Sequence, residues 1–147
     1  MKVYVATALE RAADHNRLRD ALVRHGHTLT YDWTTHGSVK NQGQKIIRDV
    51  AVAETGGILA ADMLVALLPG GRGTHVEIGI AIGAGVPVLL VASDESDLFG
   101  LGPETCAFYH SPAVDLARLI GRGWDEEGWP GYVASLLDPY LTLRRSG

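Results

Sequence analysis

Short apolar runs alternate with amphipathic segments along most of this chain. Three of these runs predict strands, at Lys2–Thr7, Met63–Leu68 and Val86–Val91. The last two contain no polar side chain, which is typical of strands buried on both faces of a parallel sheet. β-Branched and aromatic content predicts a further strand at Thr28–Trp33, and Ala107–His110 is expected to form a short fifth one.

The segments between these strands carry apolar positions at helical spacing. Gly26 gives a stop signal after the first helix, and the Gly, Ser, Thr and Asn content of Thr34–Gln44 predicts a loop. Pro139 can break the last helix. The predicted helices are Asp14–Arg24, Lys45–Ala61, His75–Ala84, Ala113–Ile120 and Tyr132–Leu143.

Alternation of apolar strands with helices implies βαβ units. The expected fold class is therefore α/β, with one three-layer domain built on a parallel sheet of about five strands. In such a sheet a ligand binds at the carboxyl ends of the strands, beside the point where the strand order reverses. The loops after Thr7, Trp33, Leu68 and Val91 are expected to surround that place.

Composition narrows the classes of function. A chain of 147 residues fits one domain, and a net charge of -4 disfavours general nucleic-acid binding. The single cysteine, Cys106, excludes an internal disulfide, and the six histidines lack metal-ligand spacing, so we expect neither a metal nor a cofactor. The chain also lacks the apolar segment of a signal peptide or of a membrane span, so we expect a cytoplasmic protein.

The most informative stretch is Leu68–Gly85, LPGGRGTHVEIGIAIGAG. A buried strand ends in a glycine-rich turn, and a helix is expected to open near Thr74. Glycines allow positive φ and close approach of a ligand, while the first N–H groups of a helix suit an anion. The stretch is neither a Walker loop nor a G-x-G-x-x-G fingerprint, and a tight turn without a ligand explains the glycines equally well. The residues predicted to bind substrate here are Gly71, Arg72, Gly73 and Thr74.

Glu77 favours a catalytic interpretation of this turn. It is expected in the first turn of the helix, among Val76, Ile78 and Ile80. A carboxylate there can simply complement the helix dipole, or it can be desolvated and held for attack on an anomeric carbon. Retaining glycosyl transfer needs such a nucleophile, because a covalent glycosyl ester divides one difficult displacement into two easier ones.

With these motifs the chain resembles the nucleoside 2-deoxyribosyltransferase-like superfamily. The resemblance extends from KVYVATALE through TYDWTTHGS to AETGGILAADMLVALLPGGRGTHVEIGIAIGAGVPVLLV. It implies a flavodoxin-like or Rossmann-like domain and an enzyme that acts on nucleosides or nucleotides. It also implies that Glu77 is the covalent nucleophile, that Tyr4 orients its carboxylate, and that Glu54 takes the place of an aspartate near the leaving base or sugar. A homodimer or higher homo-oligomer is the implied assembly.

The stretch PGGRGTHVE also resembles the P-G-G-x-G-T-x-x-E pattern of cytokinin-activating phosphoribohydrolases, which cleave nucleoside 5'-monophosphates. The start of the chain is less similar to that family. In related monophosphate glycosidases the first loop often carries Gly-Ser followed by Arg, whereas here it reads Thr7, Ala8, Leu9 and Glu10. A glutamate opposes a phosphate, so nucleosides and their monophosphates both stay open as substrates, with Thr7 expected to contact them.

Asp32, Trp33 and His36 complete the predicted substrate site, because they follow the second strand at the ligand edge. A base could stack on the Trp33 indole; the alternative is that Trp33 packs at a strand end. The expected reaction is cleavage of an N-glycosidic bond through a glycosyl–Glu77 intermediate, with Glu54 or Asp32 assisting protonation of the base. The alternatives are a non-catalytic nucleotide-binding or signalling module and a flavoprotein.

Overall fold

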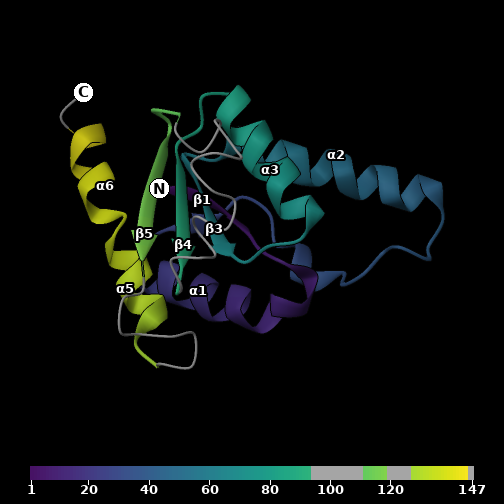
Figure 1. Ribbon diagram of the computed structural model, residues 1–147, viewed down its shortest axis with the longest axis horizontal. Coiled ribbons are helices and arrows are strands. Elements are labelled where there is room, and N and C mark those ends of the chain that lie inside the picture. Colours follow the sequence, from purple (N-terminus) through teal and green to yellow (C-terminus); the bar gives the residue numbers. More distant parts are fainter. Residues whose placement is uncertain (94–110, 119–126, 146–147) are drawn as a thin grey trace.

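The computed structural model describes residues 1–93, 111–118 and 127–145, and it contains a five-stranded, all-parallel sheet with helices on both faces (Figure 1). The strand order is β2-β1-β3-β4-β5. The predicted α/β fold class is confirmed. The strands are β1 (Lys2–Ala6), β2 (Thr28–Leu29), β3 (Met63–Leu68), β4 (Val88–Ala92) and β5 (Val114–Arg118). The helices are η1 (Leu9–Arg11), α1 (Ala12–Arg24), η2 (Trp33–Thr35), α2 (Gln44–Ala60), α3 (Arg72–Gly83), α5 (Trp129–Ser135) and α6 (Asp138–Arg145).

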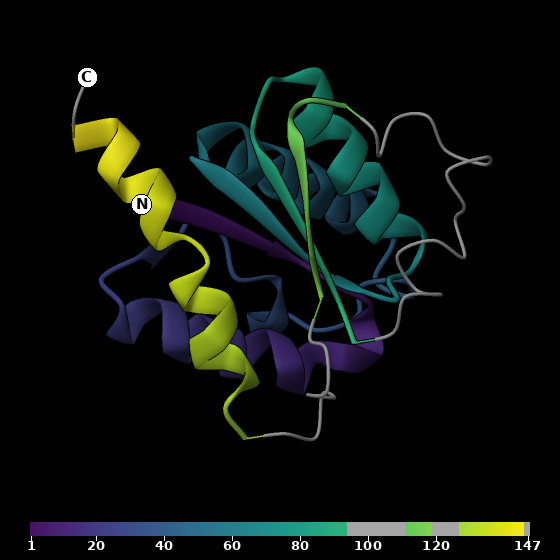
Figure 2. The ribbon, with the colours of Figure 1, turned by 60° about the vertical axis from the view of Figure 1, so that its left-hand side comes forward.

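Each face of the sheet has its own apolar core. Alternation along β1 sends Val3 and Val5 to the face covered by α1 and α5, and Tyr4 and Ala6 to the face covered by α2 and α3 (Figure 2). Leu18 of α1 packs in the first core. β3 and β4 are buried along their whole length, because one core covers each of their faces. This burial on both faces explains why their sequences are continuously apolar.

The strand order reverses between β1 and β3. The chain leaves β1 for β2 on one side and crosses back to β3 on the other, so the carboxyl ends of β1 and β3 lie next to each other. Their register runs from Val3 opposite Met63 to Ala6 opposite Ala66. This is the place where parallel sheets bind ligands. The buried Thr7 hydroxyl donates to the Leu67 carbonyl at 2.9 Å and ties the two strand ends together.

The prediction of a helix at Ala113–Ile120 is wrong. Residues Val114–Arg118 form β5, which pairs with the whole of β4, from Val88 opposite Val114 onward. A segment this short fits both a helical and an alternating apolar pattern. The edge of β4 offers backbone N–H and C=O groups that need partners, and pairing with them favours the strand. The strand predicted at Ala107–His110 lies outside the described residues.

The second strand is shorter than predicted. Only Thr28 and Leu29 pair with β1, and Trp33 begins η2 rather than ending a strand. The Asp32 carboxylate accepts a hydrogen bond from the Thr34 backbone N–H at 3.0 Å, and such a local bond replaces ladder pairing with a turn.

The closing helix is divided, although not at the proline. α5 ends at Ser135 and α6 begins at Asp138, so Pro139 is the second residue of α6, where a helix tolerates proline. The Tyr140 hydroxyl donates a hydrogen bond to Asp115 of β5, which fastens α6 to the edge strand. Among the described residues, no helix is both long and apolar enough to cross a membrane.

Candidate active site

Two side chains from different elements meet on the α2–α3 face of the sheet. Tyr4 lies in the middle of β1 and is fully buried, and Glu77 is the sixth residue of α3. The prediction that Glu77 lies in the first turn is wrong, because α3 begins at Arg72 rather than near Thr74. The carboxylate reaches back along its helix, so that Glu77 Oε1 lies 3.8 Å from where a Cβ on Gly73 would be.

Burial determines the chemistry of this pair. It raises the pKa of Glu77 to about 7, which the Tyr4 hydroxyl partly counteracts and the charge of Glu54 reinforces. Burial, together with the charges of Glu77 and Glu54, raises the pKa of Tyr4 far above its usual value of 10. Tyr4 therefore stays protonated and can act only as a donor toward the carboxylate.

One oxygen of each residue is left without a full hydrogen bond. Within the described part of the chain, the Tyr4 hydroxyl and Glu77 Oε2 are buried and make no hydrogen bond of standard geometry. The hydroxyl is nevertheless close enough to the carboxylate to lower its pKa. Buried polar atoms are nearly always bonded, so an exception needs a reason. A nucleophile requires an electron pair that is not engaged in a hydrogen bond or solvated by water, and Glu77 Oε2 is in this state.

Glu54 brings a second carboxylate to the same place. It is half-buried on the inner side of α2, and burial raises its pKa, while His36 lowers it to a smaller extent. The Tyr31 ring lies 6.0 Å from the His36 ring, and burial followed by the charge of Glu54 raises the pKa of Tyr31. The structure thus groups Tyr4, Glu54 and Glu77, with His36 at their edge.

The glycine-rich turn is built differently from the expectation. Gly70, Gly71 and Gly73 all avoid positive φ, so the turn does not use the positive φ that glycine allows. At Gly70 a Cβ would lie 2.5 Å from the Thr74 side chain, so the missing atom makes room for that residue. The buried Thr74 hydroxyl accepts a hydrogen bond from the Gly71 N–H at 3.1 Å and caps α3, whereas Arg72 is exposed on its first turn.

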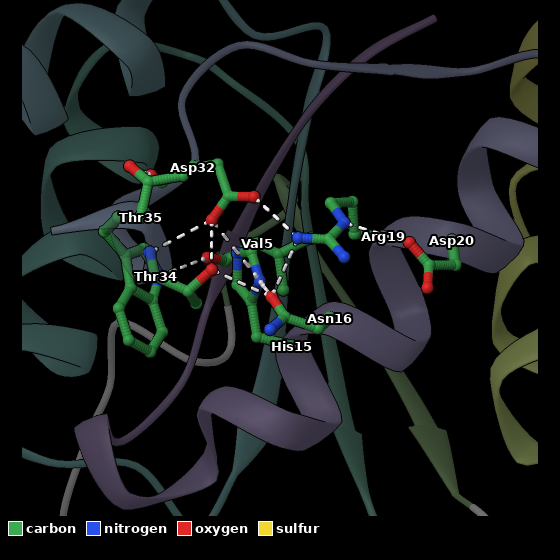
Figure 3. A network of polar contacts seen from close by, with 9 residues as sticks. Val5, His15, Asn16, Arg19, Asp20, Asp32, Thr34 and Thr35 are labelled. Carbon is green, nitrogen blue, oxygen red and sulfur yellow. Dashed lines mark hydrogen bonds and ion pairs between the residues drawn. The ribbon is translucent and has the colours of Figure 1, made fainter. Parts of the chain in front are cut away.

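Asp32 belongs to a polar network against α1 (Figure 3). Its carboxylate pairs with Arg19 at 3.0 Å, and it also accepts hydrogen bonds from the backbone N–H and hydroxyl of Thr34. Burial would raise the pKa of Asp32, but the bonds from Thr34 and Arg19 outweigh it and hold the pKa below its usual value. Asp32 is therefore ionised at neutral pH and holds no proton to donate.

Trp33 lies in the core, with 5% of its surface exposed. Its indole N–H donates to the Val5 carbonyl at 3.1 Å, and its ring meets His15 edge to face at 4.9 Å between centroids. This placement corresponds to the packing role, and stacking of a base on the indole stays a prediction. His36 Nδ1 lies 2.8 Å from the Gly37 carbonyl, which orients its ring toward Tyr31 and Glu54.

The sequence did not single out Arg11. The short helix η1 turns this side chain toward the β3–α3 turn, where its guanidinium donates to the Pro69 carbonyl at 3.4 Å and pairs with Asp14 at 3.1 Å. Glu10, which opposes a phosphate in the sequence pattern, is exposed beside it. Nothing local in the sequence relates Arg11 to Pro69, because only the pairing of β1 with β3 brings them together.

Metal binding finds no support in the described part of the chain. Across residues 1–93, 111–118 and 127–145, no three His, Cys, Asp or Glu side chains gather closely enough to hold an ion. What the site offers is two carboxylates with raised pKa values, one permanently protonated tyrosine and a helix N-terminus. This combination suits acid–base and nucleophilic chemistry.

Comparison with known proteins shows the family of this chain. The family model described as nucleoside 2-deoxyribosyltransferase matches residues 3–132. The chain therefore belongs to the nucleoside 2-deoxyribosyltransferase family, a family of enzymes. No sequence among curated proteins matches it.

Two solved structures share the fold. The Clostridium botulinum CMP N-glycosidase BcmB is 17% identical, with a TM-score of 0.62 over 94% of this chain and 99% of that one. A conserved protein from Enterococcus faecalis V583 is 23% identical, with a TM-score of 0.50 over 80% of this chain and 81% of that one. At such identities the likeness concerns the architecture of the domain.

The raised pKa of Glu77 makes stability depend on pH. Because the folded state holds this proton more tightly than the unfolded state, the contribution of Glu77 to stability falls as pH rises from about 4.5 to about 7. Glu77→Gln removes this loss, so the variant should be more stable than the parent at pH 8, by up to about 3 kcal/mol. Urea unfolding at pH 8 and pH 4 measures the difference.

The gain should disappear at pH 4, where Glu77 is protonated in both states. Glu10→Gln is the matched control, because Glu10 is exposed and its replacement should leave stability unchanged at either pH. Equal stability of parent and Glu77→Gln at pH 8 would show that the carboxylate is not buried.

Proposed function

We propose that this protein cleaves the N-glycosidic bond of a nucleoside or nucleoside 5'-monophosphate through a covalent glycosyl–Glu77 intermediate. The observation that carries the proposal is the buried Glu77 carboxylate, which lies beside Tyr4 and has one oxygen free of standard hydrogen bonds to the described residues. Membership of the nucleoside 2-deoxyribosyltransferase family supports the choice of bond.

In the first step an ionised Glu77 oxygen attacks C1' of the sugar. A new C1'–O bond forms as the C1'–N bond breaks, and the electron pair of that bond leaves with the base. The Tyr4 hydroxyl keeps the carboxylate in place by donating toward it, without supplying a proton of its own. The base needs a proton as it departs, and a neighbouring acid provides it.

Glu54 is the acid that we propose. Burial raises its pKa, which favours the protonated form that a donor needs, whereas Asp32 is ionised and paired with Arg19. Two carboxylates with different tasks are a recurrent solution in glycosyl transfer. In the second step Glu54 accepts a proton from water or from an incoming base, which attacks C1' and breaks the ester to Glu77.

The beginning of α3 is where a 5'-phosphate would bind. Arg11 and Arg72 lie at the β3–α3 turn, and the first N–H groups of α3 add the positive end of its dipole. The similar structure from C. botulinum is named a CMP N-glycosidase, which agrees with a monophosphate substrate. A nucleoside without phosphate would make no use of these two cations and would react at the same carboxylates.

A panel of nucleosides and their 5'-monophosphates, each with and without an acceptor base, tests the reaction. Chromatography should detect release or exchange of base by the parent, with kcat/KM falling below pH 7 as Glu77 takes up its proton. Glu77→Gln should lower turnover by at least about a thousandfold, because the nucleophile is lost.

Glu10→Gln is the control and should retain parental turnover. A parent that binds nucleotides but releases no base from any substrate would instead indicate a non-catalytic binding module. Parental turnover by purified Glu77→Gln would refute the assignment of the nucleophile.

We further propose a homodimer formed through the outer face of α2. In Figure 1 the first half of α2 extends beyond α3, and Val52 and Leu59 are 73% and 57% exposed. A groove of about 490 Å³ follows this face, and its apolar members recur at the helix-packing spacing. An interface around a two-fold axis uses the same surface of both copies, so an apolar stripe can pack against itself, and a second copy is the proposed partner. The groove is lined by Arg48, Ala51, Val52, Thr55, Gly56 and Leu59.

Sedimentation equilibrium of the full chain tests this assembly. The parent should be dimeric at micromolar concentration, and Val52→Glu should be monomeric because it places a charge in the interface. Val23→Glu is the matched control, since Val23 is 59% exposed on α1 and should leave the dimer intact. A monomeric parent, or a dimer that Val52→Glu does not weaken, would contradict the proposal.

A further inference from the structure

One glycine lies where three parts of the site come closest together. Gly57 is buried on the inner side of α2, one turn after Glu54. A Cβ at this position would lie 2.7 Å from the Tyr31 Cβ, and 3.2 and 3.3 Å from two ring carbons of Tyr4. The first distance is shorter than real Cβ contacts, so any larger residue forces a neighbour to move.

Neither neighbour can move independently of the site. The Cβ of Tyr31 is attached directly to the backbone of the segment that leads to His36, so it cannot rotate away as the end of a flexible side chain would. The Tyr4 ring is fully buried between the sheet and α2. The strain is therefore relieved by displacement of α2, which carries Glu54, or of the Tyr31 segment.

The neighbouring glycine offers a contrast. Gly56 is exposed, and a Cβ there meets nothing within 4 Å. A glycine inside a helix costs roughly 0.5–1 kcal/mol relative to alanine, so replacement of Gly56 should be neutral or stabilising. At Gly57 a glycine has the same cost, but it allows α2 to pack closely against β1.

We propose that Gly57 is a positioning residue for the reaction, which lets α2 approach β1 and Tyr31 closely enough to hold the Glu54 carboxylate beside Tyr4 and Glu77. It touches no substrate and acts through the spacing of these three side chains. The inference rests on the proposed function, because the importance of that spacing follows from a reaction that uses both carboxylates.

Gly57→Ala, with Gly56→Ala as the matched control, tests the proposal through two independent measurements. In the base-release assay, Gly57→Ala should lower kcat by at least about tenfold with a smaller change in KM, because displaced catalytic groups cost rate more than affinity. Gly56→Ala should stay within about twofold of the parent. Equal kcat values for the two variants would overturn the inference.

Carbon-13 NMR titration of the Glu77 and Glu54 carboxyl groups gives a readout that needs no substrate. Gly57→Ala should shift at least one of the two pKa values by about half a unit or more, and Gly56→Ala should shift neither. Absence of activity in the parent would refute the proposed function, while the titration would still test the spacing. Unchanged pKa values in folded Gly57→Ala would overturn the role of Gly57.

A rescue variant covers the case in which Gly57→Ala does not fold. Tyr31→Gly removes the atom at 2.7 Å, so adding Gly57→Ala to that background should cost little further stability or activity. The comparison is between the double variant and Tyr31→Gly alone. A double variant as damaged as Gly57→Ala would show that contact with Tyr31 is not the reason for the glycine.

Discussion

The site depends on the cost of keeping the Glu77 carboxylate away from water. A buried carboxylate with few hydrogen bonds destabilises the fold at neutral pH, and the pKa of about 7 measures that cost. The cost is tolerated because β1 packs into both apolar cores and α3 packs into the one that contains Tyr4. The stability gained from the apolar cores thus offsets the cost of burying the Glu77 carboxylate. A fold that exposed this carboxylate to water would be more stable at neutral pH.

Topology explains why these residues meet although they are far apart in sequence. Tyr4 lies on β1, Glu54 on α2 and Glu77 on α3, and the reversal of strand order between β1 and β3 brings these three elements to one face. Their proximity leaves different environments for the two carboxylates, since Glu77 faces a tyrosine that only donates and Glu54 faces His36. Under the proposed function, Glu77 is the nucleophile that Tyr4 holds in place, and Glu54 is the acid whose pKa is raised by burial.

Much of this arrangement was predictable from sequence, because β1, β3 and β4 are marked by apolar runs and the trio of Tyr4, Glu54 and Glu77 by a family resemblance. What could not be predicted depends on tertiary contacts. The edge of β4 turned an expected helix into β5, and burial placed Trp33 in the core. Arg11 and Gly57 gain their significance only from strand pairing and from helix–sheet distance, neither of which leaves a local pattern.

Trapping the intermediate is the most direct test of the central claim, that Glu77 bonds covalently to the sugar. A nucleoside analogue with fluorine at C2' destabilises the cation-like transition state and slows breakdown of the ester. Peptide mapping by mass spectrometry should then find one glycosyl group on the peptide that contains Glu77, together with one equivalent of released base. An adduct on Glu54 or another carboxylate, or continued base release with no adduct on the protein, would contradict the account.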